Sequence, residues 1–209
     1  MDVKTAIGNG DAEALRTLLV GDSSRANALI CWGNDDRIRT HPLHYASDLF
    51  FNKDLSMRQA LAIVGALIEA GADLDFQVDG KGDTPLIGAA SLGAEDVGLA
   101  LLDAGAESQL RGIFGETALH WAAMLGEDRL VNRLVERSDL NLKDKKYNSP
   151  PLGWAIHGYF NPPAGNKGEQ REVVALLVAA GARVESEWLE SEQVRADAAL
   201  LAALRANAI

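Results

Sequence analysis

The chain has 209 residues, of which 47% are hydrophobic, with 20 Lys and Arg against 30 Asp and Glu. This length and composition are typical of a folded domain or a short array with a buried core. The net charge of −10 argues against general binding to nucleic acid or to an anionic membrane, because both require a basic surface.

The amino-terminal region shows no signal of export or membrane insertion. The sequence starts with Met1-Asp2-Val3-Lys4 and contains neither a charged-then-apolar leader nor a run of about 18 apolar residues. Cys31 is the one cysteine in the sequence, so an intramolecular disulfide is impossible and a reducing compartment is favoured. We therefore expect a cytoplasmic protein without a membrane span.

A short motif recurs along the chain, and each copy carries a leucine in the same place. These leucines are Leu43, Leu86, Leu119 and Leu152, in steps of 43, 33 and 33 residues. An Ala-Gly-Ala triplet follows in phase at 70–72, 104–106 and 180–182. A fixed period of this length indicates a repeat architecture, in which each repeat stacks on its neighbours.

Each repeat is predicted to be two short helices followed by a turn. The first helix begins at Thr-Pro, as in Thr84-Pro85, because Thr caps a helix and Pro suits its first turn. The second helix has apolar residues at helical spacing, such as Val97 and Leu101. It ends at a glycine such as Gly105, since glycine accepts the left-handed position that closes a helix.

The motif resembles that of the ankyrin repeat family, which is Thr-Pro-Leu-His-x-Ala with a period of about 33 residues. The copies in this sequence are 42–46, 84–89, 117–122 and 150–155, and each departs from the motif at one position or more. The resemblance covers nearly the whole chain and implies an all-α solenoid of helix–turn–helix units with hairpin tips. It predicts one ankyrin-repeat domain over 1–209, with caps at 1–35 and 185–209 and repeats at 36–75, 76–108, 109–141 and 142–184.

Three segments depart from the regular repeat. The segment 21–40 is predicted to be the long exit loop of the amino-terminal cap. Two repeats are longer than the others between their helices, by the inserts Asp48 to Arg58 and Tyr159 to Gln170, and insertions often carry function. Aromatic pairs open both inserts, at 50–51 and 159–160. These rings either anchor lengthened helices or line a groove.

The resemblance implies where a partner binds, because ankyrin arrays bind on an inner surface made by the first helices and the turn tips. The candidate partner-binding residues at these positions are Tyr45, Asp48, Leu49, Leu92, Ile113, Phe114, Trp121, Met124, Leu125, Tyr147, Trp154 and His157. We expect the aromatic ones to be exposed, since Leu and Ala fill the core side, although burial in the core is a competing interpretation. Exposed aromatic clusters are typical of interaction hot spots.

The remaining polar motifs give no indication of catalysis. His44 and His120 occupy the motif histidine, which in the resembling family forms hydrogen bonds between neighbouring repeats. The pair His41 and His44 has the spacing of metal ligands, with Asp48 as the best third candidate, but this set is too small for a convincing site. No nucleophile lies beside a base. We expect no metal, no cofactor and no catalytic residue.

The sequence therefore predicts a monomeric, non-catalytic protein–protein interaction module of the adaptor or inhibitor type. Its protein partner, unidentified by the sequence, would bind in an aromatic concave groove. The alternative is a small-molecule or catalytic pocket between the concave face and the inserts of the repeats at 36–75 and 142–184, which converging polar groups would favour. A narrower form of the first hypothesis is an acidic array that masks a basic protein, with strongly salt-dependent binding.

Overall fold

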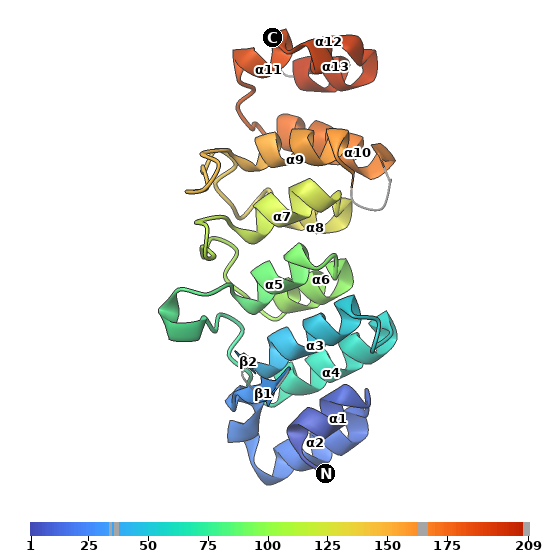
Figure 1. Ribbon diagram of the computed structural model, residues 1–209, viewed down its shortest axis with the longest axis vertical. Coiled ribbons are helices and arrows are strands. Elements are labelled where there is room, and N and C mark those ends of the chain that lie inside the picture. The colour runs from blue at the N-terminus through green and yellow to red at the C-terminus, as the bar shows by residue number, and fades with distance from the viewer. Residues whose placement is uncertain (34, 36–37, 163–166, 207–209) are drawn as a thin grey trace. The chain divides into compact units, whose positions relative to one another are not determined.

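The computed structural model describes residues 1–33, 35, 38–162 and 167–206. The chain divides into two compact units, Met1–Leu110 and Arg111–Ile209, which we call the first and the second unit. Both consist of short helices joined by turns (Figure 1). Within the described ranges, no helix is long and apolar enough to cross a membrane.

The first unit begins with a helix pair, α1 (Val3–Gly8) and α2 (Ala12–Gly21). Each helix is capped by an aspartate, because a carboxylate accepts the backbone N–H groups that a helix start leaves without partners. Asp2 accepts from the N–H of Thr5 at 2.8 Å, and Asp11 accepts from that of Ala14 at 2.9 Å. The buried apolar side chains of the pair are Ala6, Ile7, Leu15 and Leu19.

The chain then forms a 3-10 turn, η1 (Ser23–Asn27), and an antiparallel hairpin of β1 (Ile30–Trp32) and β2 (Ile38–Thr40). In the hairpin Ile30 pairs with Thr40 and Trp32 pairs with Ile38. The prediction of a long loop over 21–40 is therefore wrong for most of the described residues in this range, which form regular structure. The β-branched and aromatic side chains of the two strands explain the difference, because they favour extended backbone.

Two further helix pairs complete the first unit, together with a 3-10 turn. They are α3 (Pro42–Phe51), α4 (Met57–Glu69), η3 (Val78–Gly80), α5 (Pro85–Ser91) and α6 (Glu95–Asp103). Helices α3 and α4 have 10 and 13 residues, whereas α5 and α6 have 7 and 9. The insert at 48–58 therefore mainly lengthens the two helices, and only 52–56 lies between them.

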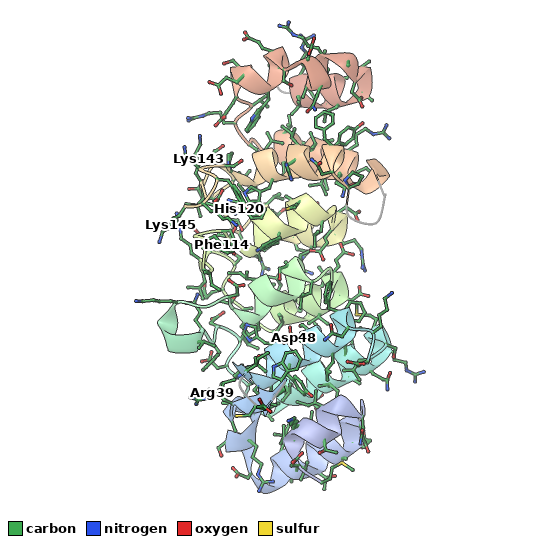
Figure 2. All side chains as sticks on the ribbon, in the orientation of Figure 1. Arg39, Asp48, Phe114, His120, Lys143 and Lys145 are labelled. Carbon is green, nitrogen blue, oxygen red and sulfur yellow. The ribbon has the colours of Figure 1, made fainter. Side chains whose placement is uncertain are left out.

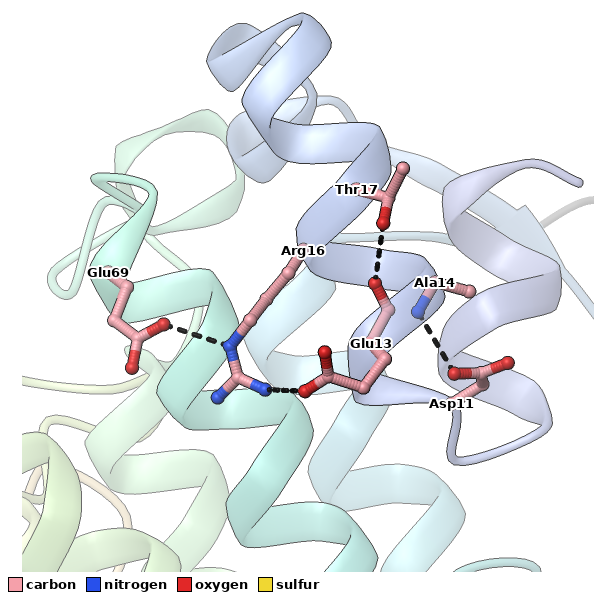
Figure 3. Close-up of polar contacts among 6 residues, drawn as sticks. All are labelled: Asp11, Glu13, Ala14, Arg16, Thr17 and Glu69. Carbon is pink, nitrogen blue, oxygen red and sulfur yellow. Dashed lines mark hydrogen bonds and ion pairs between the residues drawn. The ribbon is translucent and has the colours of Figure 1, made fainter.

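Polar contacts connect successive helix pairs in the first unit. Arg16 on α2 lies between two carboxylates, with Nε 3.0 Å from Glu69 of α4 and Nη1 2.9 Å from Glu13 (Figure 3). These side chains are largely exposed, so solvent screens both ion pairs and they contribute little to stability. A partly buried contact is that of His44, whose Nε2 donates to the carbonyl oxygen of Asp83 at 3.0 Å. This is the bond between neighbouring repeats that the resemblance implies.

The second unit begins with α7 (Ala118–Leu125), α8 (Asp128–Leu134), α9 (Pro151–Phe160) and α10 (Lys167–Ala179). Helix α9 packs against both α7 and α10. The α7–α9 contact requires Gly158, because a Cβ atom at that position would clash with the backbone carbonyl of Met124. The core between these helices includes Leu119, Leu130, Leu134, Leu152, Val173, Val174 and Leu177, all fully buried.

Up to residue 206, where the described residues end, the predicted carboxy-terminal cap consists of three short helices: α11 (Ser186–Glu190), α12 (Glu192–Ala196) and α13 (Ala198–Arg205). Tyr159 is buried, and its hydroxyl donates to Asp197 Oδ2 at 2.6 Å. The contact connects α9 to the residue that caps α13. For Tyr159, this contact supports the interpretation that the aromatic residues of the inserts anchor lengthened helices. Residues 163–166 of that insert lie outside the described residues.

Candidate functional site

The candidate site lies in the second unit, where the turns that precede α7 and α9 leave the helices on the same side (Figure 1). Figure 2 shows Phe114 on the first of these turns and Lys143 and Lys145 on the second, all beside the helices. The backbone N–H of Lys145 donates to the carbonyl oxygen of Phe114 at 2.7 Å. The two turns are therefore held together directly, in addition to the packing of α7 on α9.

A buried carboxylate organises the first turn. Glu116 is only 1% exposed, and its two oxygens accept different donors. Oε2 accepts the backbone N–H of Phe114 at 2.8 Å, and Oε1 accepts the indole N–H of Trp121 at 3.3 Å. Because Trp121 lies on α7, the carboxylate connects the turn tip to the first helix of its repeat.

A second buried carboxylate organises the next turn in a similar way. Asp144, 2% exposed, accepts the backbone N–H groups of Lys146, Tyr147 and Ser149 at 2.8, 2.6 and 3.0 Å. It also accepts the indole N–H of Trp154 on α9 at 3.1 Å. Burial alone raises the pKa of the Asp144 carboxyl, but these hydrogen bonds outweigh it and lower the pKa below its ordinary value. Asp144 is therefore ionised at neutral pH.

Three aromatic rings meet at the anchored tryptophans. The ring centroids of Trp121 and Trp154 are 5.0 Å apart with an interplanar angle of 81°. Those of Tyr147 and Trp154 are 5.8 Å apart at 71°. Two ring planes thus stand nearly perpendicular to that of Trp154, an arrangement that aromatic pairs prefer. We call Trp121, Tyr147 and Trp154 the aromatic cage.

His120 supports the cage from the interior of the unit. Its ring lies 5.5 Å from that of Trp154. Its Nδ1 accepts the backbone N–H of Thr117 at 3.1 Å, and its Nε2 donates to the carbonyl oxygen of Leu142 at 3.1 Å. Burial lowers the pKa of His120 to about 4, so the ring is neutral at physiological pH. It holds neighbouring repeats together, as the resemblance implies for the motif histidine.

The cage borders a cavity of about 430 Å³. The residues that line it are Trp121, Met124, Tyr147, Ser149, Gly153, Trp154 and His157. Five of the predicted partner-binding residues are therefore brought together here. Tyr147 is 61% exposed at the rim, whereas Trp154 is 5% exposed and contributes the most deeply placed ring. Ile113 and Phe114 are exposed on the first turn, and Leu125 is half-buried at the end of α7.

The prediction that the inward-facing aromatic residues are exposed is wrong for Trp154 and Tyr45, and the candidate Leu49 is buried as well. Trp154 is covered because Tyr147, Trp121 and His120 all pack against its ring. Tyr45 is buried because Trp32 of the unpredicted hairpin packs against it, with ring centroids 5.6 Å apart. Leu49 is buried at the end of α3, where the following turn folds back and donates two N–H groups to its carbonyl oxygen.

The other candidates of the first unit are Asp48 and Leu92, both half-buried. Asp48, labelled in Figure 2, lies on α3 and follows His44 by one helical turn in the sequence. No set of three or more His, Cys, Asp or Glu residues within the described ranges is placed to hold a metal ion. Burial raises the pKa of the Asp48 carboxyl to about 6, because the charged form is partly desolvated.

Asp48→Asn is expected to stabilise the protein by about 1–2 kcal/mol at pH 7–8, and by much less near pH 4. The folded pKa of about 6 exceeds the ordinary value of a carboxyl group, so the folded wild type binds a proton more tightly than the unfolded chain. The wild type is therefore relatively most stable below about pH 4 and loses stability as the pH rises through about 6. Urea unfolding of both proteins across this range measures the effect.

The exposed Asp54, which follows α3, provides the matched control for that experiment. Asp54→Asn makes the same chemical change outside the buried region and is expected to alter stability by less than about 0.5 kcal/mol. If the wild type and Asp48→Asn differ in free energy of unfolding by the same amount at pH 4 and at pH 8, the charge on Asp48 does not destabilise the folded state.

Comparison with known families agrees with the structure. The helix–turn–helix units define a helical repeat protein, and residues 114–145 match the family model of the ankyrin repeat. The match runs from the first turn through α7 and α8 to the second turn. It confirms the resemblance to the ankyrin repeat family and the all-α solenoid fold class. Ankyrin repeats generally mediate protein–protein interactions and are typically non-catalytic. No curated protein matches the sequence.

Proposed function

We propose that the chain is a non-catalytic protein-binding module whose contact surface is the cage, its cavity and the two turn tips of the second unit. The observation that carries this proposal is the exposure of Tyr147, which lines a cavity with aromatic walls, together with the exposure of Ile113 and Phe114 on the neighbouring turn. Large exposed apolar side chains that gather around a hollow mark interaction sites. Aromatic residues are also enriched among those that dominate binding energy.

Hydrogen bonds hold the parts of this surface in place without a partner, and this supports a binding role. Glu116 and Asp144 hold both turn tips and both indole rings through hydrogen bonds. A binding site that is already ordered loses little conformational entropy when it forms a complex. Residues of functional sites often lie on loops that the rest of the fold holds in position.

The alternative of a small-molecule or catalytic pocket has weaker support. The volume of about 430 Å³ falls in the range of ligand sites. However, the two carboxylates beside the cavity are buried and already accept hydrogen bonds, so they are poorly placed to act as an acid or base. We therefore favour a protein partner.

The charge distribution suggests a second feature of the partner. Residues 1–110 contain 8 Lys and Arg against 17 Asp and Glu, whereas residues 111–209 contain 12 against 13. Nearly all of the net negative charge thus belongs to the first unit. A partner that engages this unit as well as the cage is expected to carry a basic segment, and electrostatic attraction of this kind increases the association rate more than the affinity.

Affinity capture with quantitative mass spectrometry tests the proposal. The double variant Tyr147→Ala, Ile113→Ala removes two exposed side chains, so it should fold normally. The amount of partner that it captures should nevertheless fall at least about tenfold. The matched control is Val20→Ala, Ile38→Ala, which removes two exposed apolar side chains of the first unit. Equal capture by the wild type and both variants would remove the support for this surface.

A further inference from the structure

We propose that the aromatic cage binds a methylated lysine side chain of a partner polypeptide. This inference rests on the proposed function, because it names the chemistry that the protein-binding surface recognises. Three rings border one cavity, and two of their planes stand nearly perpendicular to the third. All three rings line the cavity, and those of Trp121 and Tyr147 are more accessible than that of Trp154, so a guest can lie against more than one π system, an arrangement that attracts an organic cation.

The charges behind the rings favour a cation over a neutral guest. Glu116 and Asp144 are almost completely buried and accept the indole N–H groups of Trp121 and Trp154. Each carboxylate thus places negative charge next to a ring without reaching the cavity itself. Charged acceptors also form the stronger class of hydrogen bond, so the orientation of both rings is well defined.

The carboxylates have no oxygen without a hydrogen bond, and this favours a methylated ammonium group over an unmodified one. Both oxygens of Glu116 and both of Asp144 already accept hydrogen bonds. An unmodified ammonium group is strongly hydrated and requires acceptors for its three N–H groups when it leaves water. A trimethylated ammonium has no N–H group to satisfy, and its methyl groups can pack against the rings.

A cation already lies against this cluster within the chain itself. Lys146 Nζ is 4.9 Å from the ring centroid of Tyr147 and 4.5 Å from that of Phe114. Lys146 does not line the cavity, so its ammonium group lies outside it. The contact shows that the turn-tip rings are placed to receive positive charge, as expected for exposed aromatic faces.

The openness of the cage favours a side chain over a free small molecule. Tyr147 and His157 are both exposed at the rim, whereas sites for free ligands usually enclose most of the ligand surface. A side chain enters such a cavity from one end and leaves its backbone outside. The exposed Ile113 and Phe114 then offer apolar contacts to the neighbouring residues of the same peptide.

Calorimetric titration with three capped tripeptides tests the proposal. The central residue of the three peptides is lysine, trimethyllysine or the neutral isostere of trimethyllysine, in which carbon replaces the ammonium nitrogen. We expect the trimethyllysine peptide to bind the full chain about tenfold more tightly than either of the others. Equal affinity for the neutral isostere would overturn the proposal, because the cavity would then be only an apolar hollow. Equal affinity for free tetramethylammonium would overturn the assignment to a polypeptide side chain.

Variants of one exposed residue separate ring chemistry from simple apolar contact without endangering the fold. Tyr147→Phe keeps the ring and should bind the trimethyllysine peptide within about twofold of wild type, whereas Tyr147→Leu should weaken binding about tenfold. Val20→Ala, which removes an exposed side chain of the first unit, should leave the affinity for this short peptide unchanged. If no peptide binds but the capture experiment still depends on Tyr147 and Ile113, the inference fails and the proposed function stands.

Discussion

Asp144→Ala is expected to lower the free energy of unfolding by about 3–5 kcal/mol, the largest effect that we expect from a single substitution at the site. The carboxylate is 2% exposed and accepts three backbone N–H groups and the indole N–H of Trp154. Its removal leaves these donors without their acceptor in a largely buried position, and each such loss is costly. Urea unfolding followed by tryptophan fluorescence and by circular dichroism measures the change.

The control for this substitution is Asp139→Ala, which lies shortly before Asp144 in the second unit. Asp139 is exposed and accepts the backbone N–H of Asn141 at 2.9 Å. Its removal is expected to cost less than about 1 kcal/mol, because water can replace an exposed acceptor. If the two substitutions destabilise the protein equally, the buried network around Asp144 does not have the role assigned to it.

Gly158→Ala is expected to destabilise the protein by about 2–4 kcal/mol, although alanine is intrinsically the better helix former. The added Cβ atom would clash with the backbone carbonyl of Met124, and a helix backbone cannot move as a flexible side chain can. Helices α7 and α9 would have to separate, which would also disturb the cage between them. The same unfolding measurement applies, with binding of the trimethyllysine peptide as a second readout.

Gly65→Ala is the matched control, since Gly65 also lies inside a helix but a methyl group added there would meet no neighbouring atom within 4 Å. This substitution is expected to stabilise the protein by about 0.5–1 kcal/mol, the ordinary preference of a helix for alanine. Opposite signs at the two glycines would show that close helix packing, and not helix propensity, decides the effect. A neutral or stabilising result at Gly158 would contradict the tight α7–α9 contact.

The repeat architecture could be predicted because it depends on local signals that recur. Thr84-Pro85 begins a helix in the structure, and its threonine hydroxyl caps that helix as expected. The motif histidines form the predicted bonds, with His44 and His120 each donating to a backbone carbonyl of the following repeat. Both copies that keep the motif histidine form such a bond, so the motif was sufficient to predict it.

The details of the site depended on contacts that have no fixed spacing. Glu116 precedes its tryptophan by 5 residues, but Asp144 precedes Trp154 by 10, so no common motif connects the carboxylates to the indole rings. An aspartate or glutamate in each turn is the one signal that was visible, and it also describes many ordinary turns. The burial of Trp154 follows from these contacts, which is why its exposure was predicted wrongly.

The hairpin of the first unit shows a second limit of sequence patterns. Each strand has only three residues, too few for alternation to stand out from a loop. Since Trp32 of this hairpin covers Tyr45, the missed strands also explain the wrong prediction at Tyr45. An error in one short segment thus became an error at a candidate binding residue.

The most direct measurement of the central claim is the affinity of a captured partner for the single variant Tyr147→Ala, with Val20→Ala as control. Both residues are exposed, so neither change should alter the fold. We expect the dissociation constant to rise at least about tenfold for Tyr147→Ala and by less than about twofold for Val20→Ala. Unchanged affinity for Tyr147→Ala, with the partner still bound, would contradict the claim that the second unit binds its partner at the aromatic cage.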